Sequence, residues 1–395
     1  MKSKLFICCT LFLALLICNA CEEPVSPNRF EDTTKLWPAA DSTGAKVGYI
    51  NAKGKMVIPA QYKEAYFFSG GVAKVVTFDN QIRFINPQGA VVYTQPSNES
   101  IKEDYFYNGY IRFYTSEGEG LYDSNFNITV PTIYSELGKV SKEGFVRFYS
   151  VFRDENGTWK SDTAGYLNIK GNSVFHDLPD GIFVDGLSDF CDGRAVVAGL
   201  THSKEPDVYW LRGAINTNGE LVIDTMYQEL RHLGGGLLAY KSPESAYYGL
   251  MDIDGNVITE EVFYGIKECG ENELYPMTYS YENEGPWGYV DKTGNVKIEP
   301  SYTYCYPFHE GVAWVYYHDS SKELGEGDIY KLIDTNGHVL WELKNTQYPL
   351  TYSHNGLMLI AENYKDGNRD VMYVDKKQNV VYKWKWYNWY PWLME

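Results

Sequence analysis

One unit recurs about nine times along this chain, and that repetition constrains the fold more than any other feature. Its clearest copy reads Trp287-Gly288-Tyr289-Val290-Asp291, then Gly294, then Val296-Lys297-Ile298, and later Gly311-Val312-Ala313. Consecutive copies are about 35 to 48 residues apart, and a period of this size indicates a solenoid, a propeller or another array. We call the Asp or Asn that ends the first apolar run the anchor; the anchors are Asn51, Asn86, Asp123, Asn168, Asn216, Asp252, Asp291, Asp334 and Asp375.

Each anchor predicts a β-hairpin. An Asp or Asn side chain can accept a hydrogen bond from the backbone two residues on, and a glycine can then take the left-handed conformation that closes the loop. Gly stands three residues after seven of the nine anchors, whereas Phe126 and Gln378 occupy that place in the other two units. The flanking residues are β-formers, and a third strand is predicted from segments such as 71–75 and 311–315.

These units predict an all-β chain of tandem hairpin or three-stranded repeats. The high tyrosine content, 35 residues, suits half-buried strands. Because an isolated hairpin is marginal in water, the units must pack on their neighbours. We expect residues 36–395 to form one β-propeller-like ring of about eight blades, in which the ninth hairpin and the N-terminal strand share a closing blade. An open β-repeat array is the alternative.

The pattern resembles the WG-repeat family, named for the Trp-Gly that opens the unit, over roughly residues 37–385. Only Trp287-Gly288 carries the full dipeptide. The first residue of the pair is replaced in other units by Val47, Glu119, Ala164, Arg212 or Tyr248, and Arg83 and Lys331 replace even the glycine. The resemblance implies no enzymatic activity.

The first twenty residues have the anatomy of a secretory signal, with Lys2 and Lys4 before an apolar run. The segment Ile17-Cys18-Asn19-Ala20-Cys21 resembles a lipoprotein signal-peptidase site, which implies lipidation of Cys21; an ordinary signal peptide cut elsewhere stays open. Residues 1–20 are therefore predicted as the signal, and 21–35 as a flexible tether. The chain is expected to be an outer-membrane lipoprotein, periplasmic or surface-exposed, that contacts the membrane through its lipid anchor.

Charge and cysteine content narrow the choice of partners. The net charge is -17, and without Lys2 and Lys4 it becomes 33 − 52 = -19, so nucleic acid is not expected as a partner. Only Cys191, Cys269 and Cys305 follow the lipidated cysteine. They lie far apart and are odd in number, so we predict buried apolar cysteines rather than a zinc site.

No motif predicts a catalytic residue, a metal ligand or a cofactor. The seven histidines form no His-Glu-x-x-His, and no Gly-x-Ser-x-Gly or phosphate-binding loop occurs. Residues 252–256 with Glu261 resemble part of a calcium loop, although the hairpin already explains Asp252 and Gly255. Paired acids, Glu260 with Glu261 and Glu282 with Glu284, could serve as glycosidase carboxylates.

The C-terminal segment is the one compositionally unusual stretch. It carries Trp384, Trp386, Trp389 and Trp392. These side chains form either a closing strand packed on the core or an exposed aromatic platform for sugar rings or a peptide. The sequence as a whole favours a non-catalytic binding or scaffold module for a protein or glycan; an envelope enzyme acting on polysaccharide is the alternative, and a purely structural envelope protein is a third reading.

Overall fold

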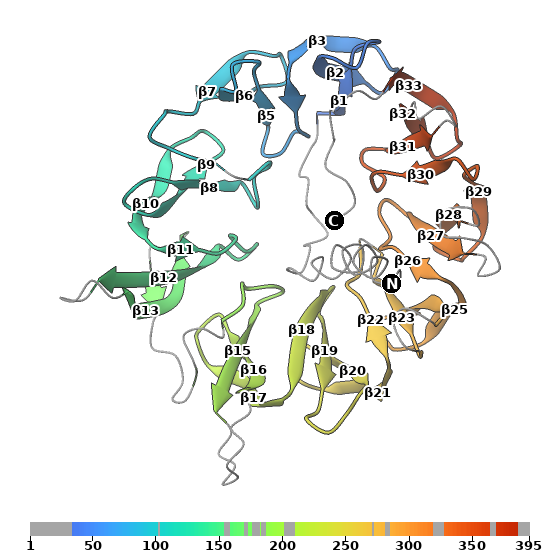
Figure 1. Cartoon of the computed structure of the whole chain (residues 1–395). Coiled ribbons are helices and arrows are strands. Elements are labelled where there is room, and N and C mark those ends of the chain that lie inside the picture. The colour runs from blue at the N-terminus through green and yellow to red at the C-terminus, as the bar shows by residue number, and fades with distance from the viewer. Residues whose placement is uncertain are drawn as a thin grey trace, which may run out of the picture.

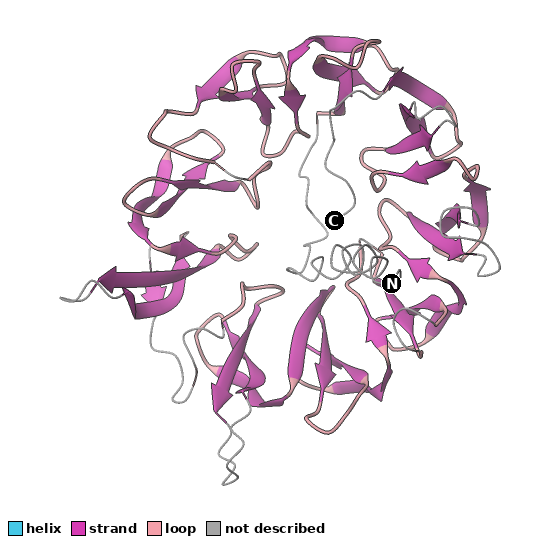
Figure 2. Cartoon of the chain, in the orientation of Figure 1, coloured by secondary structure: helices cyan, strands magenta, loops and turns pink. Residues whose placement is uncertain are grey.

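The chain folds into a ring of nine small antiparallel sheets, the blades of a β-propeller (Figure 1). The computed structural model describes residues 34–101, 103–153, 159–169, 173–175, 182, 187–200, 210–270, 272–280, 285–318, 328–363 and 369–385. Strands and the loops between them make up these ranges (Figure 2). They contain no helix long and apolar enough to cross a membrane.

Blades hold three or four strands, with the first toward the central opening and the last at the periphery (Figure 1). In chain order the blades are β1 (Leu36–Ala40), β2 (Val47–Asn51) and β3 (Met56–Tyr62); β4 (Glu64–Ala65), β5 (Ala73–Val76), β6 (Ile82–Ile85) and β7 (Val91–Thr94); β8 (Tyr110–Tyr114), β9 (Glu119–Asp123) and β10 (Ile128–Tyr134); β11 (Glu136–Leu137), β12 (Phe145–Arg153), β13 (Trp159–Asn168) and β14 (Ser173–Phe175); β15 (Arg194–Leu200), β16 (Trp210–Asn216) and β17 (Leu221–Tyr227); β18 (Glu229–Gly234), β19 (Leu237–Lys241), β20 (Tyr248–Asp252) and β21 (Val257–Phe263); β22 (Gly265–Ile266), β23 (Leu274–Thr278), β24 (Trp287–Asp291) and β25 (Val296–Tyr302); β26 (Tyr304–Cys305), β27 (Val312–His318), β28 (Asp328–Asp334) and β29 (Val339–Glu342); and β30 (Gln347–Pro349), β31 (Leu357–Asn363), β32 (Arg369–Asp375) and β33 (Val380–Lys385).

The predicted anchor hairpins are confirmed wherever the structure describes them. In eight units the anchor's side-chain oxygen accepts the backbone N–H groups two and four residues on, at 2.8 to 3.1 Å. The residue three places on has positive φ even where it is not glycine, at Phe126 (φ 61) and Gln378 (φ 66). The side-chain acceptor therefore holds the same turn with or without glycine.

The glycine of the Trp-Gly position is required for a different reason: the backbone of the outer strand passes close to its Cα. A Cβ on Gly288 would lie 2.3 Å from the carbonyl oxygen of Ile298, and one on Gly48 or Gly213 would meet the same contact at 2.3 Å. In these three blades the outer strand bulges over the glycine; for example, Tyr289 pairs with Ile298 while Trp287 pairs with Tyr302. The bulge leaves no room for a side chain.

Tyrosine hydroxyls join neighbouring blades at their cores. Tyr49 donates to the carbonyl oxygen of Tyr66 at 2.8 Å, and Tyr289 donates to that of Tyr306 at 2.7 Å, each in the next blade. The equivalent Tyr373 donates to Pro38 at 2.9 Å, from the last blade to the first. One apolar cluster also spans these two blades. The ring is thus closed by packing and hydroxyl bonds of the kind that link its other blades.

The ring has nine blades rather than the expected eight or so, and this corrects the predicted way in which the ring closes. The N-terminal strand β1 pairs with β2, and the ninth hairpin, β32 with β33, completes its own sheet with β30 and β31. Four strands fit into so short a unit because the innermost strand is very short, with two residues in β4, β11, β22 and β26. Strands of that length carry no periodic signal in the sequence.

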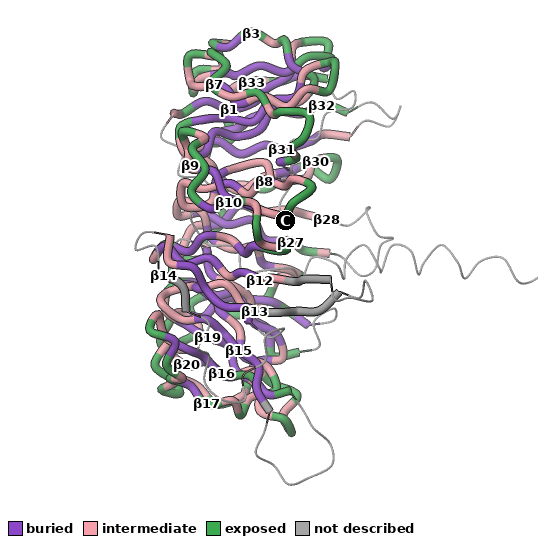
Figure 3. Tube along the Cα trace, turned by 90° about the vertical axis from the view of Figure 1, so that its left-hand side faces the viewer, coloured by how far each residue is buried: buried purple, intermediate pink, exposed green. Residues whose placement is uncertain are grey.

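Viewed edge-on, the ring is a disc with two faces (Figure 3), and the strand order gives the two faces different connections. Since the strands are antiparallel, the links from first to second strand and from third to fourth in a four-stranded blade lie on one face, which we call the turn face. The strands of the three-stranded blades, which begin with β1, β8 and β15, correspond to the second, third and fourth strands of the other blades. The remaining links form the opposite loop face. On the turn face, side chains accept hydrogen bonds from the glycine N–H of the next blade at 2.8 to 3.2 Å: Glu143 from Gly193, Asp192 from Gly236, Asn272 from Gly311 and Glu310 from Gly356. These acceptors are engaged in holding blades together.

Candidate binding face

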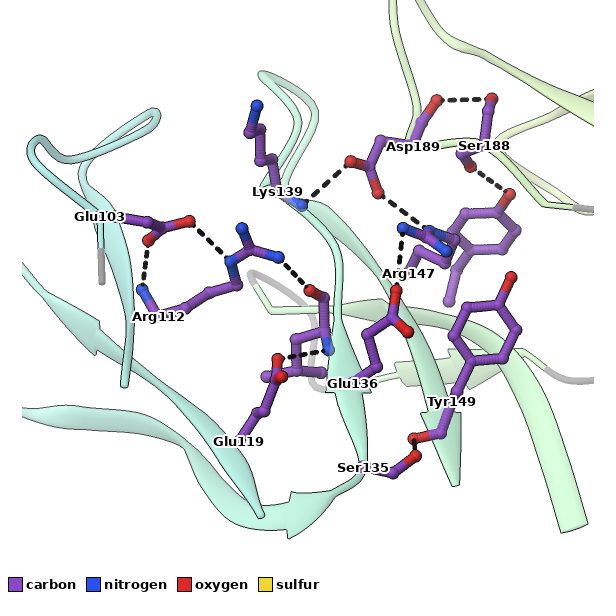
Figure 4. Close-up of polar contacts among 12 residues, drawn as sticks. Glu103, Arg112, Glu119, Ser135, Glu136, Lys139, Arg147, Tyr149, Ser188 and Asp189 are labelled. Carbon is purple, nitrogen blue, oxygen red and sulfur yellow. Dashed lines mark hydrogen bonds and ion pairs between the residues drawn. The ribbon is translucent and has the colours of Figure 1, made fainter. Parts of the chain in front are cut away.

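Cations on three consecutive blades, one buried and two half-buried, make polar contacts between blades; Figure 4 draws those of Arg112 and Arg147. Lys74, Arg112 and Arg147 each stand three residues after the glycine that ends the inner turn of their blade. Lys74 lies 2.9 Å from Asp104 of the next blade, and Arg112 donates to the carbonyl oxygen of Leu137 in the blade after its own. Each cation therefore fastens one blade to its neighbour.

Arg147 shows the balance of forces at these positions. Its Nε lies 3.3 Å from Asp189 in the next blade and its terminal nitrogen 3.5 Å from Glu136. Burial alone would lower the pKa of Arg147, but the carboxylates and Tyr149 more than offset it, so the pKa stands above its ordinary value. The same carboxylate of Asp189 accepts the N–H of Lys139 at 3.0 Å. This network is structural and offers no uncompensated charge to a ligand.

Of the candidate carboxylates, Asp252, Asp254 and Glu261 have partners within the protein, whereas Glu260 is exposed. Asp252 accepts the hairpin N–H groups of Asp254 and Asn256, as the anchors of other units do. Asp254 pairs with Arg194 at 2.6 Å, and Glu261 accepts the N–H of Ser242 at 2.5 Å. Glu282 and Glu284 lie outside the described residues. Nowhere in the described ranges do three or more His, Cys, Asp or Glu side chains gather as a metal site would require.

The three cysteines have the environments expected of apolar residues. Cys269 and Cys305 are buried and Cys191 is half-buried, and all three are free thiols. Burial raises the pKa of Cys269 to about 11 and that of Cys191 to about 12. A thiol that resists ionisation is a poor nucleophile and a poor metal ligand.

His232, on β18, is buried with neither ring nitrogen hydrogen-bonded to any described group. Burial lowers its pKa from 6.5 to about 4, although Asp192 and Glu143 act in the opposite direction. Between those pH values protons bind the unfolded chain in preference to the folded one, so the folded state loses stability as the pH falls.

We expect the free energy of unfolding to fall by about 2 kcal/mol more in the wild type than in His232→Leu between pH 7.5 and 5.0. Leucine fills a similar volume and carries no titrating group. Urea denaturation at both pH values measures the difference. The contributions of the carboxylates to the pH dependence are the same in both proteins and therefore cancel. An equal loss in the two proteins would contradict the assignment.

The predicted aromatic tail is only partly within the described structure. Trp384 on β33 is 4% exposed and packs beside Tyr373 and Tyr382, with ring centroids 5.8 and 5.9 Å away. Its side chain belongs to the core between the last and first blades. Cys21, Trp386, Trp389 and Trp392 lie outside the described residues.

A set of exposed aromatic side chains that sequence analysis did not single out lies on the loop face. Of the large hydrophobic side chains that are exposed in the described ranges, the aliphatic ones all lie on outermost strands. The aromatic ones all lie where the second and third strands of a blade connect, and they are 44% to 57% exposed: Phe78, Trp210, Tyr247, Tyr279 and Tyr317. The last four come from four consecutive blades, and we call them the aromatic crescent.

Polar groups lie beside the crescent at its Tyr317 end. Tyr316 donates its hydroxyl to Asp328 at 2.6 Å, and His318 Nδ1 lies 2.7 Å from the same carboxylate oxygen. At Tyr247, the ring of Tyr264 stands nearly perpendicular, with centroids 6.2 Å apart. Flat aromatic faces next to hydrogen-bonding groups can hold a ring-shaped polar ligand. No periodic signal marks the crescent, because its members lie in connections of unequal length.

The family model described as WG containing repeat matches residues 48–77, 213–242 and 287–318. Each match runs from the third strand of one blade to the second strand of the next, so the sequence repeat and the blade are offset by two strands. No curated protein matches the chain.

Among solved structures, the chain is similar to a eukaryotic initiation factor (14% identity, 80% of this chain and 95% of that chain, TM-score 0.44). It is also similar to apo AztD from Citrobacter koseri (10%, 91% and 96%, TM-score 0.39) and to BamB from Moraxella catarrhalis (12%, 86% and 94%, TM-score 0.31). At these identities and scores, nothing follows about what this chain binds.

Proposed function

We propose that this chain, which is built of WG-containing repeats in a nine-bladed propeller, is a non-catalytic binding module of the bacterial cell envelope. In this proposal lipid on Cys21 holds it at the outer membrane, and the loop face engages a glycan chain. The aromatic crescent is the observation that carries the proposal, because tyrosine and tryptophan side chains exposed at the same connection of consecutive blades offer stacking surfaces to a ligand.

The arrangement of the crescent favours a glycan over a folded protein partner. A protein interface has a contiguous apolar centre from which water is excluded. Here each blade supplies one separate aromatic side chain, from Trp210 through Tyr317, with polar groups such as His318 and Asp328 nearby. Separate stacking surfaces around an arc suit an extended polymer that places one sugar ring at each of several positions.

Binding to cell-envelope polysaccharides tests the proposal. The mature chain is expected to be retained on at least one polysaccharide of a panel of bacterial and host glycans. Alanine at a single crescent position should weaken retention about 2- to 10-fold, which corresponds to about 0.5–1.5 kcal/mol per aromatic contact. Phe78→Ala is the matched control, since Phe78 is exposed on the same face but stands apart on the second blade.

Three outcomes would count against the proposal. Release of reducing sugar would replace the non-catalytic module with an envelope enzyme. Retention that is unchanged when all four crescent residues are alanine would remove the crescent from the site. Binding of a protein from the same envelope, with no binding of any glycan, would replace the ligand class.

The anchor is tested separately from the binding site. Cys21→Ser is expected to move the protein from the membrane fraction to the soluble fraction, and metabolic labelling with a fatty acid should be lost in the same variant. Protease added to intact cells distinguishes surface display from a periplasmic location. Membrane association that survives Cys21→Ser would contradict lipidation at this residue.

A further inference from the structure

The outermost strand of the second blade, β7, leaves an open sheet edge on the rim of the ring. An unpaired edge presents backbone N–H and C=O groups to other chains, and proteins usually protect it with proline or charged side chains. Among the outermost strands of four or more residues, β7 alone contains neither; its sequence is Val91-Val92-Tyr93-Thr94. The others contain Pro59, Pro131, Asp224, Glu260 and Glu261, Pro300, Glu342, or Lys383 and Lys385.

The rim around β7 also lacks charge. Residues 87–98, which contain β7, and residues 124–135, which contain β10 of the next blade, include no Asp, Glu, Lys or Arg. We call these two segments the uncharged rim; their strands lie on neighbouring blades at the periphery (Figure 1). Each is the twelve residues after an anchor, and in every other unit those twelve residues include at least two charged ones. The charges are all acidic in the units of β17 and β21 and all basic in those of β3 and β33.

The uncharged rim exposes much apolar surface. Ile133 and Ile128, at 66% and 61%, are the two most exposed of the large hydrophobic side chains in the described ranges, and Val91 and Val92 are 47% and 49% exposed. Of its twenty-four residues only Val130 is buried. One side of a standard protein interface contains about 20 to 30 residues, so the uncharged rim is large enough to form one. Contiguous apolar surface of this kind indicates an interaction site.

The two strands of the uncharged rim are held together by aromatic packing. The ring of Tyr93 on β7 stacks on Phe126 in the anchor turn of the next blade, with centroids 4.1 Å apart and planes 2° apart. Phe126 occupies the place that glycine has in most units, with φ 61. Glu99, the carboxylate that follows β7, accepts the hydroxyls of Tyr93 at 2.6 Å and Tyr122 at 3.0 Å. The surface is therefore ordered before a partner binds, which lowers the entropic cost of association.

We propose that the uncharged rim binds a second copy of this chain, with the two β7 strands antiparallel and edge to edge about a two-fold axis. In a two-fold contact each surface meets its own copy. The acidic segments of β17 and β21 would then face acids, and the lysines of β3 and β33 would face lysines. The uncharged rim is the part of the periphery where two chains of net charge -17 can meet without such repulsion.

The dimer leaves the proposed glycan site accessible. Its contact is made by the second and third blades, whereas the aromatic crescent comes from the four blades of β16, β20, β24 and β28 (Figure 1). The rim and the loop face are also different surfaces of the disc. Each copy would therefore present its own crescent, and neither proposal requires the other.

Sedimentation velocity of the Cys21→Ser chain tests the dimer, since lipid cannot cause association in this variant. At about 100 µM it should sediment with the mass of two chains, because a small interface has a Kd of about 1 µM or below. Val91→Lys should raise that Kd by about tenfold or more, because it places a positive charge from each copy at the shared edge. Val257→Lys is the matched control: Val257 is 56% exposed on β21, stands five residues after its anchor as Val91 does, and should leave the Kd unchanged.

Amide hydrogen exchange supplies a second readout, at the strand itself. The β7 amides should exchange more slowly at about 100 µM than at about 0.1 µM, whereas exchange in β21 should not depend on concentration. A monomer at about 100 µM, or an equal loss of dimer in the two lysine variants, would overturn the proposal. So would a dimer whose β7 amides exchange at the same rate at both concentrations. Glycan retention is measured separately, so either proposal can fail without the other.

Discussion

Replacing Gly288 by alanine is expected to lower the free energy of unfolding by about 3 kcal/mol, the upper end of the usual cost of overpacking a core. The added methyl group would lie 2.3 Å from the carbonyl oxygen of Ile298 and 2.6 Å from the nitrogen of Pro300. Both contacts are backbone atoms of the bulged outer strand, so neither can rotate away as a side chain could. The strand must shift as a whole, and its hydrogen bonds to β24 weaken with it.

Gly311→Ala is the matched control, because it separates crowding from backbone conformation. Gly311 has φ +79 and nothing within 4 Å of its added Cβ, so only the left-handed conformation is penalised, at about 1 kcal/mol. Urea or thermal denaturation of the two variants measures both costs. Equal losses would show that close approach is not what the Trp-Gly glycine provides.

Replacing Asp189 by alanine is expected to cost about 2 to 3 kcal/mol, because a buried cation loses its nearest carboxylate. The change leaves Arg147, whose side chain is 14% exposed, with the longer carboxylate contact to Glu136 and its contact with the Tyr149 ring, and it removes the acceptor of the Lys139 N–H. Losing one partner of a fully buried ion pair costs about 3–5 kcal/mol, and partial exposure of this pair reduces that figure.

A double-mutant cycle with Arg147→Met isolates the interaction. Methionine fills the space of the aliphatic stem without a charge, so the double variant should be more stable than the sum of the single losses predicts by at least about 1 kcal/mol. Urea denaturation of the four proteins supplies the values. Additive losses would mean that the two side chains stabilise the blades independently.

Local features of the fold follow from the sequence because their causes lie within a few residues. Asp291 accepts hydrogen bonds from the backbone N–H groups two and four residues further along the chain. The hairpin can therefore be predicted from the spacing alone. The presence of the repeat also requires packing between units, which excludes a single isolated hairpin. The WG-repeat resemblance and the all-β class were both predictable for these reasons.

The blade boundary was not predictable in the same way. Each sequence unit contributes its first two strands to one blade and its last two to the next, and a two-residue strand such as β4 or β26 gives no alternation to read. Counting hairpins therefore gave the number of units but suggested the wrong closure. The cations Lys74, Arg112 and Arg147 were also missed, since each has a partner in the following blade.

The sequence by itself determined the hairpins, their number and the all-β class, because these depend on side chains that contact their own backbone. Only the tertiary structure decided that nine blades close into a ring and that four aromatic side chains, from Trp210 to Tyr317, stand on one face. Both depend on contacts between residues tens or hundreds of positions apart, such as that of Tyr373 with Pro38. Such contacts depend on how each blade packs against the next, and local spacing carries no record of them.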